Sequence, residues 1–445
     1  MTRNFSFGAC ACVAITLFCA NAGTAAAKEQ VLYSFQGGND GDQPYAAMVV
    51  DKAGNLYGTT SLGGGVGGSN CNYQASAGCG IVFELSPPAQ KGGTWTEAVL
   101  YAFQGGNDGA TPESALIADS DGNLYGTTSQ GGDGACNNQG LPGCGVVFAL
   151  TRPQSPGGAW TESVLYSFQG NPDGRGNGDF SWPNGIVLAK DGNLYGFAYS
   201  GGHCTTDETG TYCYGGAFEL RKPAGNGAWS ERILYRFRGP SGDPAGPVFD
   251  TSGNLYGTAP GGSYGCGGVF ELSPPPGRKR PWTESSVYDF RCGSDGAFPL
   301  PGLTFDAQGN LYDTSLGSAQ GYGNVFELVP AQGGWTESVL YNFTPVTNGY
   351  TPTVGPIFGA DGNLFGVTEG GGQDRIGVVY ELAPQNGGWT ESVLHSFSGG
   401  ADGIAPYGGL VIGKGGAVYG TTLAGGDGTG CGNSNGCGTV YKVEP

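Results

Sequence analysis

Apolar and polar residues alternate over short segments along the whole chain, which is typical of β-strands. In residues 95–103, for example, Trp95, Glu97, Val99, Tyr101 and Phe103 fall on one face of an extended segment. Clusters of Gly, Asp, Asn and Pro separate such segments, and no long stretch shows helical spacing of its apolar residues. The pattern therefore predicts an all-β protein.

Three short motifs each occur seven times, which indicates a tandem repeat. The first motif, Val31-Leu32-Tyr33-Ser34-Phe35, returns beginning at Val99, Val164, Ile233, Ser286, Val339 and Val393. The second motif, Gly54-Asn55-Leu56-Tyr57-Gly58, returns beginning at Gly122, Gly192, Gly253, Gly309, Gly362 and Gly416. The third motif, Val82-Phe83-Glu84-Leu85, returns beginning at Val147, Ala217, Val269, Val325, Val379 and Val440.

Each unit predicts four antiparallel strands, which are called a, b, c and d in chain order. In the first unit these are residues 46–50, 55–60, 81–85 and 95–103. Four such strands form one blade of a β-propeller. The chain thus predicts a single seven-bladed β-propeller domain over residues 28–445, with blades at 36–103, 104–168, 169–237, 238–290, 291–343, 344–397 and 398–445 plus 28–35.

The two ends of the repeat region complement each other. Strand d opens with Trp-Thr-Glu or Trp-Ser-Glu only six times, and the last unit stops after strand c. Residues 29–35, in contrast, form a strand d without a unit of its own. We therefore expect the N-terminal strand to complete the last blade and to close the ring without an open sheet edge.

The first residues have the features of a secretory signal peptide. Arg3 precedes a short apolar stretch, and Ala25-Ala26-Ala27 offers small residues for cleavage. Residues 1–27 are therefore interpreted as a cleaved signal, which places the mature protein outside the cytoplasm, secreted or periplasmic. No later segment approaches the about 20 apolar residues that a membrane span needs.

The charge balance limits the partners. The chain has 37 Asp and Glu against 19 Lys and Arg, a net charge of −18. Phosphate backbones bind clustered Lys and Arg, so nucleic acid is not an expected partner. A monomer is expected that engages a glycan or an extracellular or envelope protein.

Ten of the 13 Cys residues follow the signal segment, and an even number in an exported chain favours disulfides. Eight of them make near pairs, each between strands b and c of one unit: Cys71 with Cys79, Cys136 with Cys144, Cys204 with Cys213, and Cys431 with Cys437. Cys266 lies between strands b and c of one unit, and Cys292 lies just after strand d of the same unit. These two places are on the same end of a blade. All five bridges are predicted to shape loops on one face of the ring.

A recurring Asp-Gly element lies in the turn from strand d to the next strand a. The Asp residues of this region are Asp40, Asp42, Asp108, Asp173, Asp295 and Asp402. Asp-Gly is ordinary turn chemistry, in which the carboxylate binds nearby backbone amides. The alternative is a rim of ligands for a cation or a polar molecule, and calcium would be the cation that such oxygens suit. No other cofactor is expected.

The residues make no strong case for catalysis. The central channel is lined by small residues of strand a, and the chain has only two His, His203 and His395. We expect His395, which replaces the Tyr of a strand-d motif, to pack. Glu113, Asp179 and Asp243 are the candidate catalytic carboxylates, because the fold could bring them to the mouth of the channel.

The linked motifs Val-Leu-Tyr-x-Phe, Asp-x-x-Gly-Asn-Leu-Tyr-Gly-Thr-Thr, Gly-x-Val-Phe-Glu-Leu and Trp-Thr-Glu resemble the GloVer (Gloeo/Verruco) tandem repeat of bacterial choice-of-anchor extracellular proteins. The resemblance covers the whole mature chain and implies an exported protein of the β-propeller type. It implies no catalytic residue. The expected function is a secreted, non-catalytic binding or scaffold propeller that engages a glycan or protein through the disulfide-bonded loop face. The alternative is an extracellular polysaccharide hydrolase or lyase with carboxylates at the channel mouth.

Overall fold

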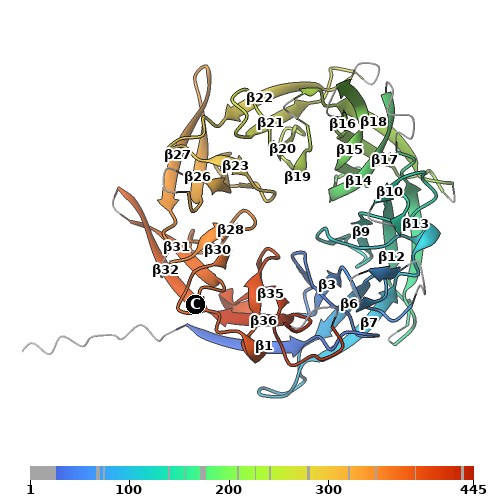
Figure 1. Cartoon of the computed structure of the whole chain (residues 1–445), viewed down its shortest axis with the longest axis vertical. Helices are drawn as coiled ribbons and strands as arrows, with labels where there is room; N and C mark the ends of the chain where they lie inside the picture. Colours follow the sequence, from blue (N-terminus) through green and yellow to red (C-terminus); the bar gives the residue numbers. More distant parts are fainter. Residues whose placement is uncertain are drawn as a thin grey trace, which may run out of the picture.

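The chain forms a ring of seven β-sheets around a central axis (Figure 1). The computed structural model describes residues 27–445 except 67–70, 74–75, 139–140, 156, 171–176, 208–209, 226, 240–241, 278–280, 319–320, 346–347, 386 and 432–434. The predicted signal segment, apart from Ala27, lies outside the described residues. The prediction of an all-β, seven-bladed propeller with four antiparallel strands per blade is confirmed.

The first four blades follow one another along the chain. Blade 1 contains β2 (Val49–Val50), β3 (Leu56–Thr60), β6 (Ile81–Ser86) and β7 (Thr96–Ala102). Blade 2 contains β8 (Ile117–Ala118), β9 (Leu124–Thr128), β12 (Val146–Thr151) and β13 (Thr161–Ser167). Blade 3 contains β14 (Asn177–Leu188), β15 (Leu194–Asp207), β17 (Gly216–Arg221) and β18 (Ser230–Arg236). Blade 4 contains β19 (Ala245–Phe249), β20 (Leu255–Ala259), β21 (Gly268–Ser273) and β22 (Thr283–Asp289).

In blades 5 to 7 strand a is split into two short pieces that pair with the same strand b. Blade 5 contains β23 (Ala297–Pro299), β24 (Thr304–Phe305), β25 (Leu311–Gly317), β26 (Asn324–Ala331) and β27 (Gly334–Asn342). Blade 6 contains β28 (Tyr350–Pro352), β29 (Ile357–Phe358), β30 (Leu364–Gly370), β31 (Val378–Gln385) and β32 (Gly388–Ser396). Blade 7 contains β33 (Ile404–Pro406), β34 (Val411–Ile412), β35 (Val418–Ala424), β36 (Thr439–Glu444) and β1 (Lys28–Ser34).

The remaining elements are short and lie in the loops. They are the strands β4 (Asn72–Tyr73), β5 (Ser76–Ala77), β10 (Asn137–Asn138), β11 (Leu141–Pro142) and β16 (Gly210–Cys213), and the 3-10 turns η2 (Gly106–Asp108), η4 (Gly400–Asp402) and η5 (Lys414–Gly416). Among the described residues, no helix is long and apolar enough to cross a membrane.

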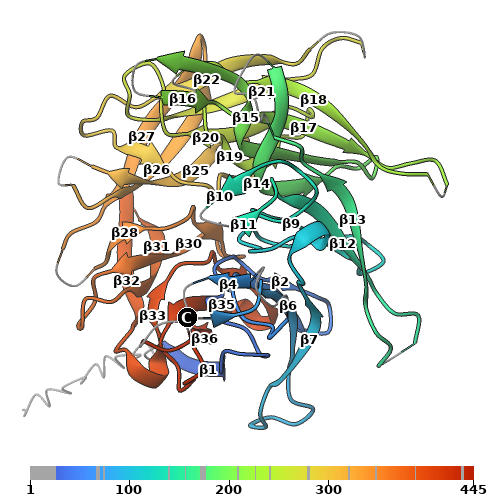
Figure 2. The ribbon, with the colours of Figure 1, turned by 45° about the vertical axis from the view of Figure 1, so that its right-hand side comes forward.

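The N-terminal strand closes the ring, as predicted. β1 pairs antiparallel with β36, in a register that runs from Lys28 opposite Glu444 to Ser34 opposite Thr439. Figure 2 shows β1 beside β36 from a second direction. Strand d of blade 7 therefore comes from the opposite end of the chain from its other strands.

Aromatic residues of the repeat pack between blades. Phe35, at the end of strand d of blade 7, meets Phe83 of blade 1 with ring centroids 5.1 Å apart. Trp95 of blade 1 packs on Tyr419 of blade 7 in the same way, at 6.1 Å. Phe35 and Phe83 are fully buried, and equivalent pairs recur around the ring. These aromatic positions therefore serve packing between neighbouring blades.

Small residues let the inner strands approach closely. A Cβ on Gly302 of blade 5 would lie 2.5 Å from the backbone nitrogen of Gly355 in blade 6, which real Cβ atoms do not do. Gly355 N also donates a hydrogen bond to Pro301 O across this junction, at 3.2 Å. Gly302 and Gly355 are therefore needed for the packing of blades 5 and 6.

Candidate functional site

The turn from strand d to the next strand a holds most of the predicted Asp rim. Asp40 accepts hydrogen bonds from Tyr33 Oη at 2.9 Å and from Gln36 N at 2.6 Å. Asp108, Asp295 and Asp402 accept the same two kinds of bond, one from a strand-d side chain and one from their own turn. Each lies at a different blade junction, so the fold does not gather them at one point. Calcium binding by this rim stays a prediction.

Two further rim residues differ from this arrangement. Asp173 lies outside the described residues. Asp179 takes the corresponding role at that junction, because it accepts hydrogen bonds from Tyr166 Oη at 3.1 Å and from Gln169 N at 2.7 Å. Asp42 is fully buried, and its backbone pairs with that of Leu62.

The three candidate catalytic carboxylates have separate partners on separate blades. Glu113 is an exposed residue of blade 2. Desolvation by neighbouring protein raises its pKa, against a hydrogen bond with Ser129. Asp243, before strand a of blade 4, has its pKa raised to about 6 by burial, against a hydrogen bond with Tyr199. Asp179, on β14, accepts the hydrogen bonds from Tyr166 and Gln169 described above. None of the three carboxylates has another of them among these partners.

A seven-fold latch joins each blade to the one before it. The residue before the first proline of each strand a has a left-handed backbone, with φ between 54° and 61°. These residues are Gln43, Thr111, Trp182, Asp243, Phe298, Thr351 and Ala405. Each donates its backbone N–H to a carbonyl just before strand c of the preceding blade, as Thr111 does to Cys79 at 2.9 Å. The latch fixes seven side chains around one end of the channel.

The five predicted disulfides are all present. The Cα–Cα distances range from 4.0 Å for Cys204–Cys213 to 5.3 Å for Cys266–Cys292. The carbonyls of Cys79, Cys144, Cys266 and Cys437 are latch acceptors. The bridges therefore hold the loops against which the latch residues are placed.

Exposed aromatic side chains gather on this loop face over blades 3 to 5. Tyr199 is 44% exposed, Tyr212 48%, Tyr264 58% and Phe298 42%. All four lie at the end of the blades that carries the b–c loops and the d–a turns. With Trp182 they form what is called here the aromatic face.

The first half of the aromatic face spans the junction of blades 3 and 4. Trp182 and Tyr199 have ring centroids 6.4 Å apart at an interplanar angle of 40°. The hydroxyl of Tyr199 shares a hydrogen bond with the carboxyl of Asp243 from blade 4. The rings of Trp182 and Tyr199 and the carboxyl group of Asp243 therefore lie close together at the junction of blades 3 and 4.

The second half lies at the junction of blades 4 and 5. The Arg291 guanidinium lies 5.9 Å from the ring centroid of Tyr264, within the range of a cation–π contact. Phe298 N donates to Cys266 O at 2.7 Å, which places Phe298 next to the loop of Tyr264. The Cys266–Cys292 bridge connects that loop to the turn that carries Arg291.

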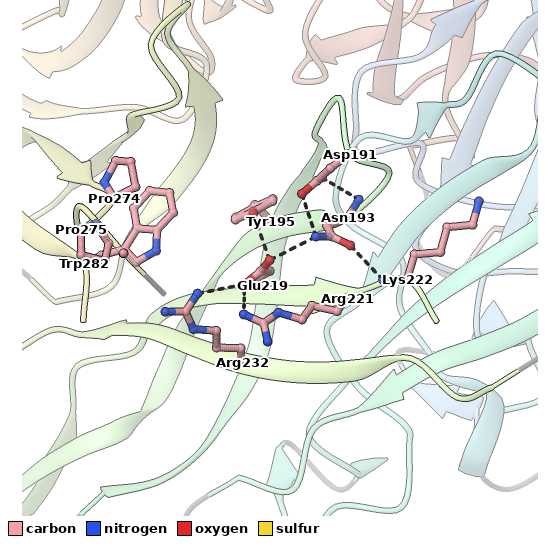
Figure 3. Close-up of a pocket in the computed structure, with 11 residues that line it drawn as sticks. Asp191, Asn193, Tyr195, Glu219, Arg221, Lys222, Arg232, Pro274, Pro275 and Trp282 are labelled. Carbon is pink, nitrogen blue, oxygen red and sulfur yellow. Dashed lines mark hydrogen bonds and ion pairs between the residues drawn. The ribbon is translucent and has the colours of Figure 1, made fainter. Parts of the chain in front are cut away.

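The opposite face has clefts between neighbouring blades. The cleft between blades 3 and 4 has a volume of about 410 Å³, and Figure 3 shows Glu219 at its centre. Glu219 accepts hydrogen bonds from Tyr195 and Asn193, both at 3.1 Å, and pairs with Arg221 at 3.1 Å and Arg232 at 3.4 Å. Similar clefts with a repeat Trp at the wall occur at two other junctions. These clefts recur with the repeat, and the hydrogen bonds and ion pairs of Glu219 satisfy its carboxylate.

The fold and its loop face define a seven-bladed β-propeller with a disulfide-bonded aromatic surface. The family profile of the Gloeobacter/Verrucomicrobia repeat matches residues 16–205 and 203–441. The chain therefore belongs to the Gloeobacter/Verrucomicrobia repeat family. No curated protein matches it.

Several solved structures have a related arrangement of strands. A protein from Lactobacillus plantarum is 13% identical with a TM-score of 0.49, covering 82% of this chain and 87% of that one. An ulvan lyase, a polysaccharide lyase, is 10% identical with a TM-score of 0.48, covering 93% and 95%. A PQQ-bound aldose sugar dehydrogenase from Streptomyces coelicolor is 12% identical with a TM-score of 0.42, covering 94% and 98%. These values are too low to transfer an activity to this chain.

Proposed function

We propose that this protein is a secreted, non-catalytic propeller that binds a neutral polysaccharide through the aromatic face. The observation that carries the proposal is the group of four exposed aromatic side chains on one face of blades 3 to 5. Such rings stack on the apolar faces of sugars, and a few placed polar groups then orient the ligand. Asp243 and Arg291 are the polar groups that lie within the aromatic face.

The charge of the chain favours a neutral glycan. The net charge of −18 repels polyanionic polysaccharides at long range. The aromatic face contains both a carboxyl group and a guanidinium group, which suit the hydroxyls of an uncharged sugar.

The proposed location is outside the cytoplasm. Five disulfides need an oxidising compartment in order to form and persist. We propose that residues 1–27 direct export and are removed after Ala27. Sequencing the N-terminus of the protein recovered from the medium or periplasm tests this; a chain that keeps Met1 contradicts it.

The binding test uses isothermal titration of the oxidised protein with a panel of soluble neutral polysaccharides. We expect saturable binding to at least one of them. The double substitution Tyr199→Ala, Tyr264→Ala is expected to weaken this binding by at least tenfold, or about 1.4 kcal/mol.

A matched control keeps the test specific. Val99→Ala removes an exposed apolar side chain from the outer strand β7, far from the aromatic face in the fold, and should leave binding unchanged. Absence of saturable binding across the panel contradicts the proposal and favours a protein partner. Binding that survives the double substitution places the site elsewhere on the ring.

A second candidate function is hydrolysis or lyase cleavage of an extracellular polysaccharide. The observation that favours it is the raised pKa of Asp243, about 6, beside the Tyr199 hydroxyl. A carboxyl group whose pKa is raised to about 6 suits proton transfer near neutral pH. Release of reducing ends or unsaturated products by the wild-type protein, lost in Asp243→Asn with binding retained, would support it. No product from any polysaccharide that binds would exclude it for that ligand.

A further inference from the structure

Neighbouring blades share a recurring group of three side chains at their outer strands. At the junction of blades 1 and 2, Tyr101 Oη donates to Asp108, and the charge of Asp108 acts on Glu162 of the next strand d. The same partners recur where Tyr33 and Asp40 meet Glu97, and where Tyr288 and Asp295 meet Glu337. This Tyr–Asp–Glu group is a structural element of the repeat.

The junction of blades 6 and 7 departs from this pattern in one residue. His395 takes the place of the Tyr on β32, and its Nε2 lies 2.9 Å from Asp402 Oδ1. Glu29 of the closing strand β1 is the third member. One ligand atom from each of the three side chains lies within 4.8 Å of the other two.

The geometry allows a metal ion to take the place of the His395–Asp402 hydrogen bond. Zinc binds imidazole nitrogen and carboxylate oxygen at about 2.0–2.2 Å, which places neighbouring ligand atoms of a tetrahedral site about 3.3–3.6 Å apart. His395 Nε2 and Asp402 Oδ1 are 2.9 Å apart, a hydrogen-bond distance. They would need to move apart by only about 0.5 Å to bind one ion, with the imidazole nitrogen unprotonated. Asp402 Oδ2 already accepts bonds from Ser398, which leaves Oδ1 for this site.

Glu29 adds an oxygen that has no protein donor. Its Oε1 is buried and has no hydrogen-bond partner among the described residues, as in five equivalent Glu residues of other strands d, and here an imidazole lies within reach of it. The side chains of His395 and Asp402 are only 18% and 16% exposed, so the group is enclosed but within reach of a small ion. An ion would leave at least one coordination position for water.

We propose that Glu29, His395 and Asp402 bind a divalent transition-metal ion of the zinc type. The imidazole selects such an ion over calcium or magnesium, which prefer oxygen ligands throughout. Because Glu29 lies on β1 and His395 on β32, the ion connects the N-terminal closing strand to the blade before it. Bound metal stabilises the folded ring, in which alone the three residues meet.

The test compares zinc binding in the wild type and two variants of the full mature chain, after treatment with a chelator. Isothermal titration with Zn²⁺ is expected to show one saturable site in the wild type, together with a rise in Tm. His395→Tyr restores the residue of the other junctions, so it should fold normally, weaken zinc binding at least tenfold and abolish the Tm rise. Glu29→Gln should also weaken binding while the His395–Asp402 contact stays in place.

Two further variants separate this site from other sources of binding. His203→Ala removes the only other His and should leave the stoichiometry at one. Tyr101→His places an imidazole beside Asp108 and Glu162 and should raise the stoichiometry to two. No saturable zinc binding in the wild type, or equal binding in His395→Tyr, overturns the proposal.

Discussion

Blades 2 and 7 have the same strand order but differ in how strand d is attached. In blade 2, β12 and β13 follow each other and form one hairpin. In blade 7, β36 is the last strand of the chain and β1 is the first, and backbone pairing joins them. Blade 7 therefore depends on noncovalent contacts where the other six blades have a covalent turn between strands c and d.

The side chains around blade 7 differ accordingly. Trp160 of blade 2 packs against Tyr57 of blade 1, with centroids 6.1 Å apart. Ala27 occupies the corresponding position before β1, and blade 6 has Phe365 where the other blades have Tyr. Ala27 packs against the cluster that contains Phe365 in the full chain, and the mature chain has no residue at this position if cleavage follows Ala27. The junction of blades 6 and 7 thus lacks both the Trp and the Tyr hydroxyl that meet at the junction of blades 1 and 2.

The largest expected effect comes from removing the closing strand. Deletion of residues 1–35 leaves β36 as an exposed sheet edge and removes Phe35 from the core. We expect the deleted protein to lose the folded monomer and to associate or unfold. Far-UV circular dichroism and size-exclusion chromatography with light scattering measure this.

A circular permutant is the matched control for that deletion. A short turn from Glu444 to Lys28 converts β36 and β1 into a hairpin like that of blade 2. New ends between Gly157 and Gly158 open the exposed turn of blade 2 instead. The permutant should fold as a monomer. A deleted chain that remains a folded monomer would show that ring closure is dispensable.

A core substitution in blade 2 is expected to have the next largest effect. Phe148 is fully buried, and its ring centroid lies 5.1 Å from that of Phe103. Phe148→Ala should lower the free energy of unfolding by about 3–5 kcal/mol, because it leaves a cavity. Val164→Ala, at a position 38% exposed on the same blade, should change it by less than about 0.5 kcal/mol. Urea unfolding checks both, and a small loss for Phe148→Ala would mean that neighbouring blades relax to fill the space.

The sequence predicts the ring well, because the ring depends on features that repeat at short range. The three motifs, the complementary ends and the close Cys pairs each identify contacts within one unit or its neighbour. The proposed metal site of Glu29, His395 and Asp402 is different, because Glu29 and His395 are far apart in sequence and come together only when β1 closes the ring. The sequence predicts packing for His395 and does not indicate its contact with Asp402.

The aromatic face also went unpredicted, although one sign of it was present. Trp182 is the only Trp outside the Trp-Thr-Glu or Trp-Ser-Glu motif, so the repeat does not require it. Its left-handed backbone could not be foreseen, because a residue before proline ordinarily prefers an extended conformation. The latch hydrogen bond to Cys144 O at 2.9 Å holds it in place.

A conservative substitution sharpens the comparison of blades 2 and 7 further. Strand c has Phe148 in blade 2 and Tyr441 in blade 7 at the same position. The Tyr441 hydroxyl is buried and has no hydrogen-bond partner among the described residues. Tyr441→Phe should therefore raise the free energy of unfolding by about 1 kcal/mol, and Phe148→Tyr should lower it. Urea unfolding of both variants is the measurement. A loss of stability in Tyr441→Phe would reveal a partner for this hydroxyl, such as a buried water molecule.

The smallest expected effect concerns the pH dependence of stability at the junction of blades 1 and 2. Burial raises the pKa of Glu162 from 4.5 to about 7, and the charge of Asp108 adds to the rise. The unfolded chain loses this proton near pH 4.5 and the folded chain near pH 7, so the folded state binds more protons between these values. The contribution of this group to the free energy of unfolding is fully present below pH 4.5 and is lost as the pH rises to about 7.

Glu162→Gln should remove that loss. It should therefore raise stability at pH 7.5 and leave it unchanged at pH 4. The gain should stay below about 1 kcal/mol, because water reaches the carboxyl group and screens its charge. Thermal unfolding of both proteins from pH 4 to 8 checks this, with Asp121→Asn as a control that removes an exposed charge from the same blade. Parallel curves for the wild type and Glu162→Gln would show that Glu162 is ionised in the ring at the same pH as in the unfolded chain.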